Sequence, residues 1–295
     1  MSAGGRDAVV QNPQGWAVAR RCEEDFVEKL RTDGYAVVPL RSAPAARSVR
    51  SALACIDVAL EEHHSAPLPK VTSDCISVAA FAERAQLRYQ PTQRTSSAAE
   101  PPLLERAAAE AAEALEQVAH WALSALGSAE GTLEGGTPLL DAFWYPGFEG
   151  WGERPGMPPP PCPAHEDVGI VSVIADTLPG LEARGADGCW RQLELREDEC
   201  VVIVGRALAA LSCGRLRACT HRVRLTARRR TSLVFERRPD AVWAERLREM
   251  QLEAAKGAAA ASSRPADELA KMRHQQRALD ALGGCREPGP RCAIM

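Results

Sequence analysis

Apolar residues recur every three or four positions in several long segments of the first half of the chain, which is the spacing of amphipathic helices. The clearest case is 103–126, where frequent alanine and glutamate also favour a helix. Further helices are predicted over 22–30 and 44–62, and residues 35–40 are typical of a strand. Residues 65–100 carry Pro, Ser and Thr without a sustained period. We therefore expect little regular structure there.

The pattern changes after Gly136, where short β-rich runs follow one another between glycines and prolines. Strands at this spacing favour an antiparallel sandwich or barrel with jelly-roll character. Residues 147–163 form an irregular insertion with four consecutive prolines, and a helical pattern returns from about 241. The predicted strands are 139–145, 168–175, 189–195, 200–204, 218–223 and 232–235.

These patterns predict an α+β protein with a mainly β core, an N-terminal helical region packed on that core and a helical C-terminal tail. The expected divisions are a flexible lead-in at 1–20, a helical region with one strand at 21–134, the β core at 135–240, C-terminal helices at 241–284 and a flexible tail at 285–295.

Composition excludes several classes of protein. The 36 Lys and Arg residues nearly balance 39 Asp and Glu residues, so the formal charge of −3 argues against a nucleic-acid binder that relies on positive charge. No apolar run approaches the roughly 20 residues of a membrane-spanning helix. The first residues lack the order of a signal peptide, and the ten cysteines form no C-x-x-C pair. We therefore expect a cytoplasmic protein with reduced thiols.

Candidate chemistry begins at His165-Glu166-Asp167, which precedes a predicted strand. On a strand, residues i and i+2 point to the same side, so His165 and Asp167 can converge on one point. This H-x-D pattern alone is weak evidence, but a strand-like run with His221 follows 54 positions after Asp167. Two histidines and one carboxylate on a β scaffold can form a facial triad for Fe(II) with open positions for other ligands.

A second motif, Arg230-Thr231-Ser232, opens the last predicted strand. By the same alternation Arg230 and Ser232 share one face, and a guanidinium beside a hydroxyl suits a buried carboxylate. Arg230 also lies in an arginine-rich stretch that includes 215–229. The alternatives are a solvated arginine or a basic patch for an acidic partner.

Taken together, these motifs resemble the isopenicillin N synthase-like Fe(II)/2-oxoglutarate-dependent dioxygenases over roughly residues 20–240. The H-x-D, the distal histidine, the R-x-S, the PGLE turn and the LS-x-GR run appear in the family's order. The resemblance implies a double-stranded β-helix in which His165, Asp167 and His221 hold iron. It also implies that Arg230 and Ser232 bind the distal carboxylate of 2-oxoglutarate.

The resemblance further implies that Tyr145 contacts the co-substrate, with O₂ as oxidant and ascorbate as a reductant. Two positions depart from the family pattern. Phe143 stands where the family usually has Asn, and Glu236 stands where it commonly places an aromatic residue in the substrate pocket. Glu236 would favour a cationic or hydroxyl-bearing substrate; the alternative is an exposed Glu paired with Arg237 or Arg238.

The function implied by the resemblance is oxidation of a small organic substrate by hydroxylation, desaturation or cyclisation, with release of succinate and CO₂. Two alternatives stay open. One is an iron-dependent oxidase of the same fold that does not use 2-oxoglutarate, and the other is a catalytically inactive binding protein. We expect a monomer with no nucleic-acid partner.

The final residues, Cys292-Ala293-Ile294-Met295, fit the C-a-a-X farnesylation pattern. One lipid chain anchors a protein only marginally, and no polybasic patch precedes Cys292. Cys285 could carry a second lipid. We therefore expect a mostly cytoplasmic enzyme that associates reversibly with membranes.

Overall fold

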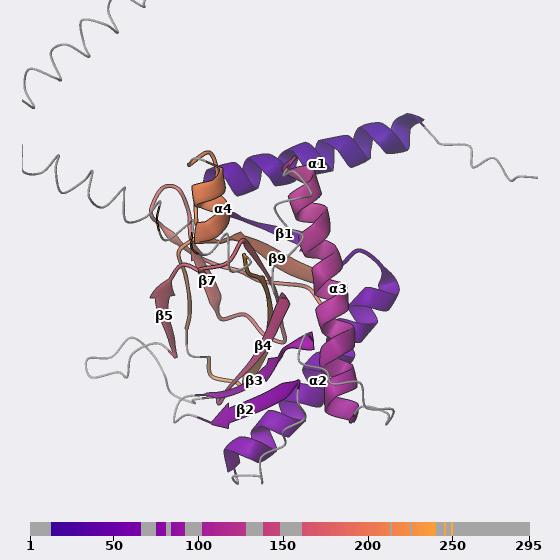
Figure 1. The fold of residues 1–295 in the computed structure, drawn as a ribbon, viewed down its shortest axis with the longest axis vertical. Helices are drawn as coiled ribbons and strands as arrows, with labels where there is room; N and C mark the ends of the chain where they lie inside the picture. Colours follow the sequence, from indigo (N-terminus) through magenta and orange to yellow (C-terminus); the bar gives the residue numbers. More distant parts are fainter. Residues whose placement is uncertain are drawn as a thin grey trace, which may run out of the picture. The chain divides into compact units, whose positions relative to one another are not determined.

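Two antiparallel sheets form the centre of the fold in a computed structural model of the chain (Figure 1). The chain divides into a compact unit, Met1–Trp243, and a second unit, Ala244–Met295. The structure describes residues 13–65, 75–80, 84–91, 102–127, 138–147, 161–212, 214–224 and 226–239, together with Glu245 and Glu249.

The larger sheet has seven strands in the order β1-β9-β6-β11-β4-β3-β2. Its central strand β11 pairs antiparallel with β4 and with β6, so Arg230 lies opposite Tyr145 and Ser232 opposite Phe143. The strands are β1 (Tyr35–Pro39), β2 (Ile76–Ala80), β3 (Ala85–Tyr89), β4 (Pro138–Tyr145), β6 (Val171–Asp176), β9 (Glu199–Val204) and β11 (Arg230–Arg237).

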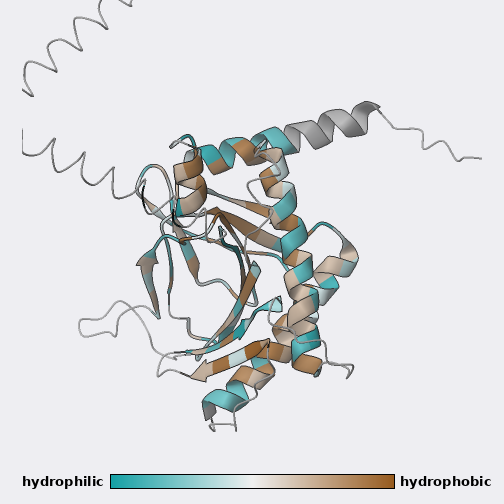
Figure 2. Cartoon of the chain, viewed as in Figure 1, coloured by the Kyte–Doolittle hydropathy of each residue, from teal (hydrophilic) through white to brown (hydrophobic). Residues whose placement is uncertain are grey.

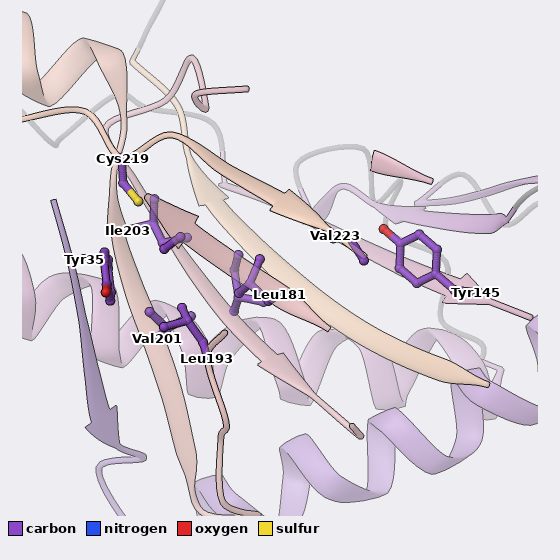
Figure 3. Packing of buried hydrophobic residues seen from close by; sticks show 10 residues of the cluster. Tyr35, Tyr145, Leu181, Leu193, Val201, Ile203, Cys219 and Val223 are labelled. Atoms are coloured by element: carbon purple, nitrogen blue, oxygen red, sulfur yellow. The ribbon is translucent and has the colours of Figure 1, made fainter. Parts of the chain in front are cut away.

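The smaller sheet has four strands in the order β5-β10-β7-β8. They are β5 (Cys162–His165), β7 (Leu181–Arg184), β8 (Trp190–Gln192) and β10 (His221–Val223). Residues from both sheets, including Val201 and Leu181, meet in one buried cluster. Figure 3 shows Tyr145 and Val223 at one end of this cluster and Tyr35 and Cys219 at the other.

Helices cover the larger sheet on one face. The helices α2 (Ala43–Ser65) and α3 (Leu103–Ala125) pack against each other and against β3, β4 and β11. The buried positions of α3 include Ala108, Leu115 and Ala122, and this periodic apolar face explains why the segment is helical and where it docks (Figure 2). The remaining helices are α1 (Pro13–Asp33), which contacts β1, and α4 (Arg206–Leu211).

The predicted fold class is confirmed: an antiparallel β core carries packed helices on one face. The helices expected at 44–62 and 103–126 and the strand at 35–40 lie within a few residues of their predicted bounds. The helix expected at 22–30 begins earlier, at Pro13, since proline is accommodated in the first helical turn, so that part of the expected lead-in is helical.

The expectation of little regular structure over 65–100 is wrong for β2 and β3. Ala85, Leu87 and Tyr89 are buried and alternate with Gln86 and Arg88, which is the period of a strand with one face against a core. The run is only five residues long and contains two long polar side chains. The short strands β5 and β7 and the short helix α4 were not predicted as elements either.

In the part of the chain that the structure describes, no helix is both long enough and apolar enough to cross a membrane. Residues 148–160, most of the predicted C-terminal helices and Cys292 lie outside the described residues. The predictions made for them, lipidation included, therefore stay predictions.

Candidate functional site

The three predicted iron ligands come together at the ends of two paired strands. His165 closes β5, His221 opens β10, and the two residues lie directly opposite each other in the pairing of these strands. Asp167 follows β5 in the chain, with its Oδ1 3.4 Å from Nε2 of His165 and 3.6 Å from Nε2 of His221. One ligand atom from each residue lies within 4.8 Å of the others.

Contacts around the triad set the orientation of both rings. Nδ1 of His165 lies 2.9 Å from the carbonyl of Pro163, and Nδ1 of His221 lies 3.2 Å from the carbonyl of Cys219. A carbonyl can only accept, so in the neutral form of each ring Nδ1 carries the hydrogen and Nε2 presents its lone pair beside Asp167. Ring orientation by a carbonyl is the usual arrangement at histidine metal ligands.

The carboxylate of Asp167 is also held by a hydrogen bond from the hydroxyl of the buried Ser172. This donor set of two imidazoles and one carboxylate fits a divalent transition metal such as Fe(II). The backbone contributes as well, because the amide of Arg206 donates to the Asp167 carbonyl at 2.9 Å. Asp167 is therefore fixed through both its side chain and its backbone.

Electrostatics distinguish the three ligands. The Asp167 carboxylate raises the pKa of the exposed His165 to about 10. Burial lowers the pKa of His221, which is only 4% exposed. Burial alone would raise the pKa of Asp167, but hydrogen bonds from His165 and Ser172 and the charge of His221 leave it below its usual value. Asp167 is thus an anion that attracts cations, whether protons or a metal.

Arg230 lines the same cavity and is 1% exposed. Its Nη2 donates to Asp176 at 2.7 Å and its Nε to the carbonyl of Leu178 at 2.9 Å, whereas Nη1 is buried without a hydrogen-bond partner among the described residues. A buried guanidinium amino group without a partner is costly unless a ligand satisfies it. The site therefore fits an anionic group of a ligand.

Tyr145 and Ser232 stand beside Arg230. The guanidinium carbon lies 5.7 Å from the centre of the Tyr145 ring, and burial raises the pKa of the Tyr145 phenol. The phenol is therefore a neutral hydrogen-bonding group at any ordinary pH. Ser232 is 2% exposed, follows Arg230 on the same face of β11 and lines the same cavity.

The cavity that contains these groups has a volume of about 160 Å³. Its apolar walls come from both sheets, so it lies between them. Every site residue predicted from the sequence other than Cys292 lines this cavity. They are Phe143, Tyr145, His165, Asp167, His221, Arg230, Ser232 and Glu236.

Phe143 and Glu236 occupy the positions where the sequence departs from the family pattern. The guanidinium of Arg84 lies over the Phe143 ring, 5.4 Å from its centre. Glu236 is 7% exposed, so the alternative of an exposed residue is wrong, although the expected pairing with Arg238 is present. Burial raises the pKa of Glu236, against the effect of Arg238.

Sequence reasoning missed four residues of this site. Asp176 neutralises Arg230, Ser172 holds Asp167, and Asp141 and Arg238 line the cavity. Strand alternation, which placed Ser232, could also have assigned Arg238 to the cavity, because Arg238 continues the series of even-numbered residues that starts at Arg230. Asp176 and Ser172 could not be assigned, since their roles depend on the pairing of β6 with β11.

Comparisons with known proteins agree with this geometry. A family model described as the 2OG-Fe(II) oxygenase superfamily matches residues 154–239. The 2-oxoglutarate-dependent dioxygenase AOP2 of Arabidopsis thaliana is 37% identical over 70 residues, which is 23% of this chain. A related protein of the same plant, described as a probable inactive dioxygenase, is also 37% identical over 70 residues. The chain spans less than a fifth of the length of either relative, at 16% and 18%.

Solved structures resemble the chain over most of its length. A putative oxygenase from Shewanella oneidensis has a TM-score of 0.60 at 19% identity, covering 78% of this chain and 95% of that one. A dioxygenase for auxin oxidation in rice has a TM-score of 0.58 at 16% identity, covering 79% and 81%. At these identities the likeness concerns the fold, and it places this chain among double-stranded β-helices.

Proposed function

We propose that this chain is an Fe(II)- and 2-oxoglutarate-dependent dioxygenase acting on a small organic substrate, in keeping with the match of residues 154–239 to the 2OG-Fe(II) oxygenase superfamily model. One observation carries the proposal. A three-residue donor set for a divalent metal and a buried guanidinium with an unsatisfied amino group line one cavity. The first suits iron and the second suits the distal carboxylate of 2-oxoglutarate.

The metal ligands and the co-substrate residues would occupy two different parts of the cavity. His165, Asp167 and His221 would hold iron from one side and leave its other side open to ligands. Arg230 and Ser232 would bind and direct the far carboxylate of 2-oxoglutarate. Once bound, iron with 2-oxoglutarate and O₂ would supply the chemistry that oxidises a substrate C–H bond and releases succinate and CO₂.

Other residues of the cavity would protect that chemistry. Ile174, Leu181 and Val234 line the walls and would exclude water from the space between the metal ligands and Arg230. Tyr145 supplies a neutral phenol that can donate a hydrogen bond without adding charge. Hydroxylation, desaturation and cyclisation all start from the same oxidation, and the choice among them depends on the substrate.

The experiment is to measure succinate formed from 2-oxoglutarate with Fe(II) present, in the wild type and in two variants of the metal ligands. We expect His165→Ala and Asp167→Ala to lose Fe(II)-dependent turnover and most of their metal affinity, because each removes one of three protein ligands. His120→Ala is the control, since His120 lies on the exposed face of α3, outside the cavity.

The same assay discriminates the alternatives. An enzyme that binds iron and consumes O₂ with a substrate but forms no succinate is an oxidase that does not use 2-oxoglutarate. A protein that binds neither metal nor 2-oxoglutarate in calorimetric titrations is a binding protein without this activity. Full succinate formation by His165→Ala at low Fe(II) would contradict the assigned ligands.

A further inference from the structure

The last residues of β11 and the position just after it carry charged groups into the cavity beyond the co-substrate residues. Alternation along the strand brings Ser232, Val234, Glu236 and Arg238 to the same side as Arg230, and all of them line the cavity. Arg237 between them turns to the opposite face, where it pairs with Glu116 of α3 at 2.6 Å. The cavity wall therefore ends in a buried carboxylate and a guanidinium.

Glu236 uses both of its oxygens within the protein. Oε1 accepts from the backbone amide of Gly169 at 2.9 Å, and Oε2 accepts from Nε of Arg238 at 2.7 Å. The first bond anchors Glu236 to the loop that carries the metal ligand Asp167. The second fixes the direction of the Arg238 guanidinium. A buried carboxylate held in this way acts as a support for the arginine.

Arg238 keeps most of its bonding capacity. Its side chain is 41% exposed, and among the residues that the structure describes nothing binds its two terminal amino groups. Asp141, the other acid in this part of the cavity, differs, because Arg88 binds its two oxygens at 2.8 Å and 2.9 Å. Both carboxylates are thus neutralised, and among the described residues at this end of the cavity the guanidinium of Arg238 is the group with free donors.

We propose that Arg238 binds a carboxylate group of the substrate and that Glu236 is the residue that positions it. A planar guanidinium held through Nε presents two amino groups in the fork geometry that matches a carboxylate. This inference rests on the proposed function, since it assigns the substrate end of the same cavity. It replaces the expectation that Glu236 would select a cationic substrate.

The test uses three matched sets of probes: butanoate, hexanoate and octanoate, the corresponding primary amides, and the corresponding alkylamines. Binding is measured by calorimetry to protein saturated with Mn²⁺ and 2-oxoglutarate, so that Arg230 is occupied. We expect at least one carboxylate to bind about tenfold or more tightly than its amide and its amine. Arg238→Met should weaken the binding of that carboxylate by a similar factor, and Arg238→Lys should weaken its binding less.

Arg50→Met is the matched control, because Arg50 is 44% exposed and is also ion-paired, with Glu197, but does not line the cavity. It should bind the carboxylate as the wild type does. Amines that bind more tightly than carboxylates and lose affinity in Glu236→Gln would overturn the proposal in favour of direct recognition by Glu236. Equal affinity for carboxylate and amide, or an unchanged affinity in Arg238→Met, would also overturn it.

Failure of the proposed function is separable from failure of this inference. If titration shows no binding of 2-oxoglutarate to the Mn²⁺-treated protein, the proposed function fails. The carboxylates are then titrated into metal-free protein and into Arg230→Met. Binding that is lost in Arg238→Met and retained in Arg230→Met still supports the site at Arg238, and the reverse pattern overturns it.

Discussion

Replacing Arg230 by methionine tests two roles of this residue at once, because the guanidinium both faces the cavity and pairs with Asp176. Loss of charge-assisted hydrogen bonds worth about 1.5–3 kcal/mol should raise the KM for 2-oxoglutarate by about 10- to 150-fold. The same substitution leaves Asp176, whose side chain is 2% exposed, as an unpaired buried charge. Breaking a buried ion pair from one side costs about 3–5 kcal/mol of stability.

That penalty is a large part of an ordinary free energy of unfolding of about 5–15 kcal/mol, so the single variant is expected to melt well below the wild type. The double variant Arg230→Met with Asp176→Asn removes both charges and should recover much of the stability. It should not recover the affinity for 2-oxoglutarate. Stability is read from thermal unfolding, and affinity from calorimetric titration of 2-oxoglutarate in the presence of Mn²⁺.

The two measurements separate binding from folding. A double variant that regains both stability and 2-oxoglutarate affinity would refute the assignment of Arg230 as the carboxylate-binding residue, because its effect would then be structural alone. An unchanged KM in a folded Arg230→Met variant would refute it directly and would favour the oxidase that does not use 2-oxoglutarate.

Two further predictions concern the support of Asp167. Ser172→Ala removes the hydroxyl that donates to Asp167 and should weaken metal binding by about 10- to 100-fold, measured by titration with Fe(II) or Mn²⁺ under nitrogen; unchanged affinity would show that the hydroxyl is dispensable. Gly205→Ala should destabilise the protein by about 1–3 kcal/mol, because a Cβ there would clash with the carbonyl oxygen of Gly169. A melting temperature equal to that of the wild type would show that the backbone shifts at no cost.

The sequence was informative where local geometry decides the outcome. Strand alternation placed Arg230 and Ser232 together on β11, and His165 and Asp167 lie together as expected, although Asp167 stands in the loop after β5 and not on the strand itself. The helical periodicity of 103–126 predicted the face of α3 that is buried on the sheet. These features depend on the residues of one element, so one sequence is enough to read them.

The remaining features depend on which elements become neighbours. Asp176 meets Arg230 because β6 pairs with β11, and Glu236 reaches Gly169 across 67 positions of sequence. Neither contact leaves a local pattern. The burial of Glu236 is a similar case. The strand β11 ends in charged residues, which are typical of an exposed strand end, but the exposure of Glu236 depends on the neighbouring loop that covers it.

The place of β5 in the smaller sheet gives the metal centre a mechanical role. This strand is four residues long and lies at the edge of its sheet, and within the described part of the chain it pairs with β10 alone, where the register is irregular. An ion held jointly by His165 and His221 would tie the edge strand to its single neighbour as a cross-link does. Amide hydrogen exchange in β5 would then report the metal content of the protein, slow when loaded and fast when stripped, independently of catalysis.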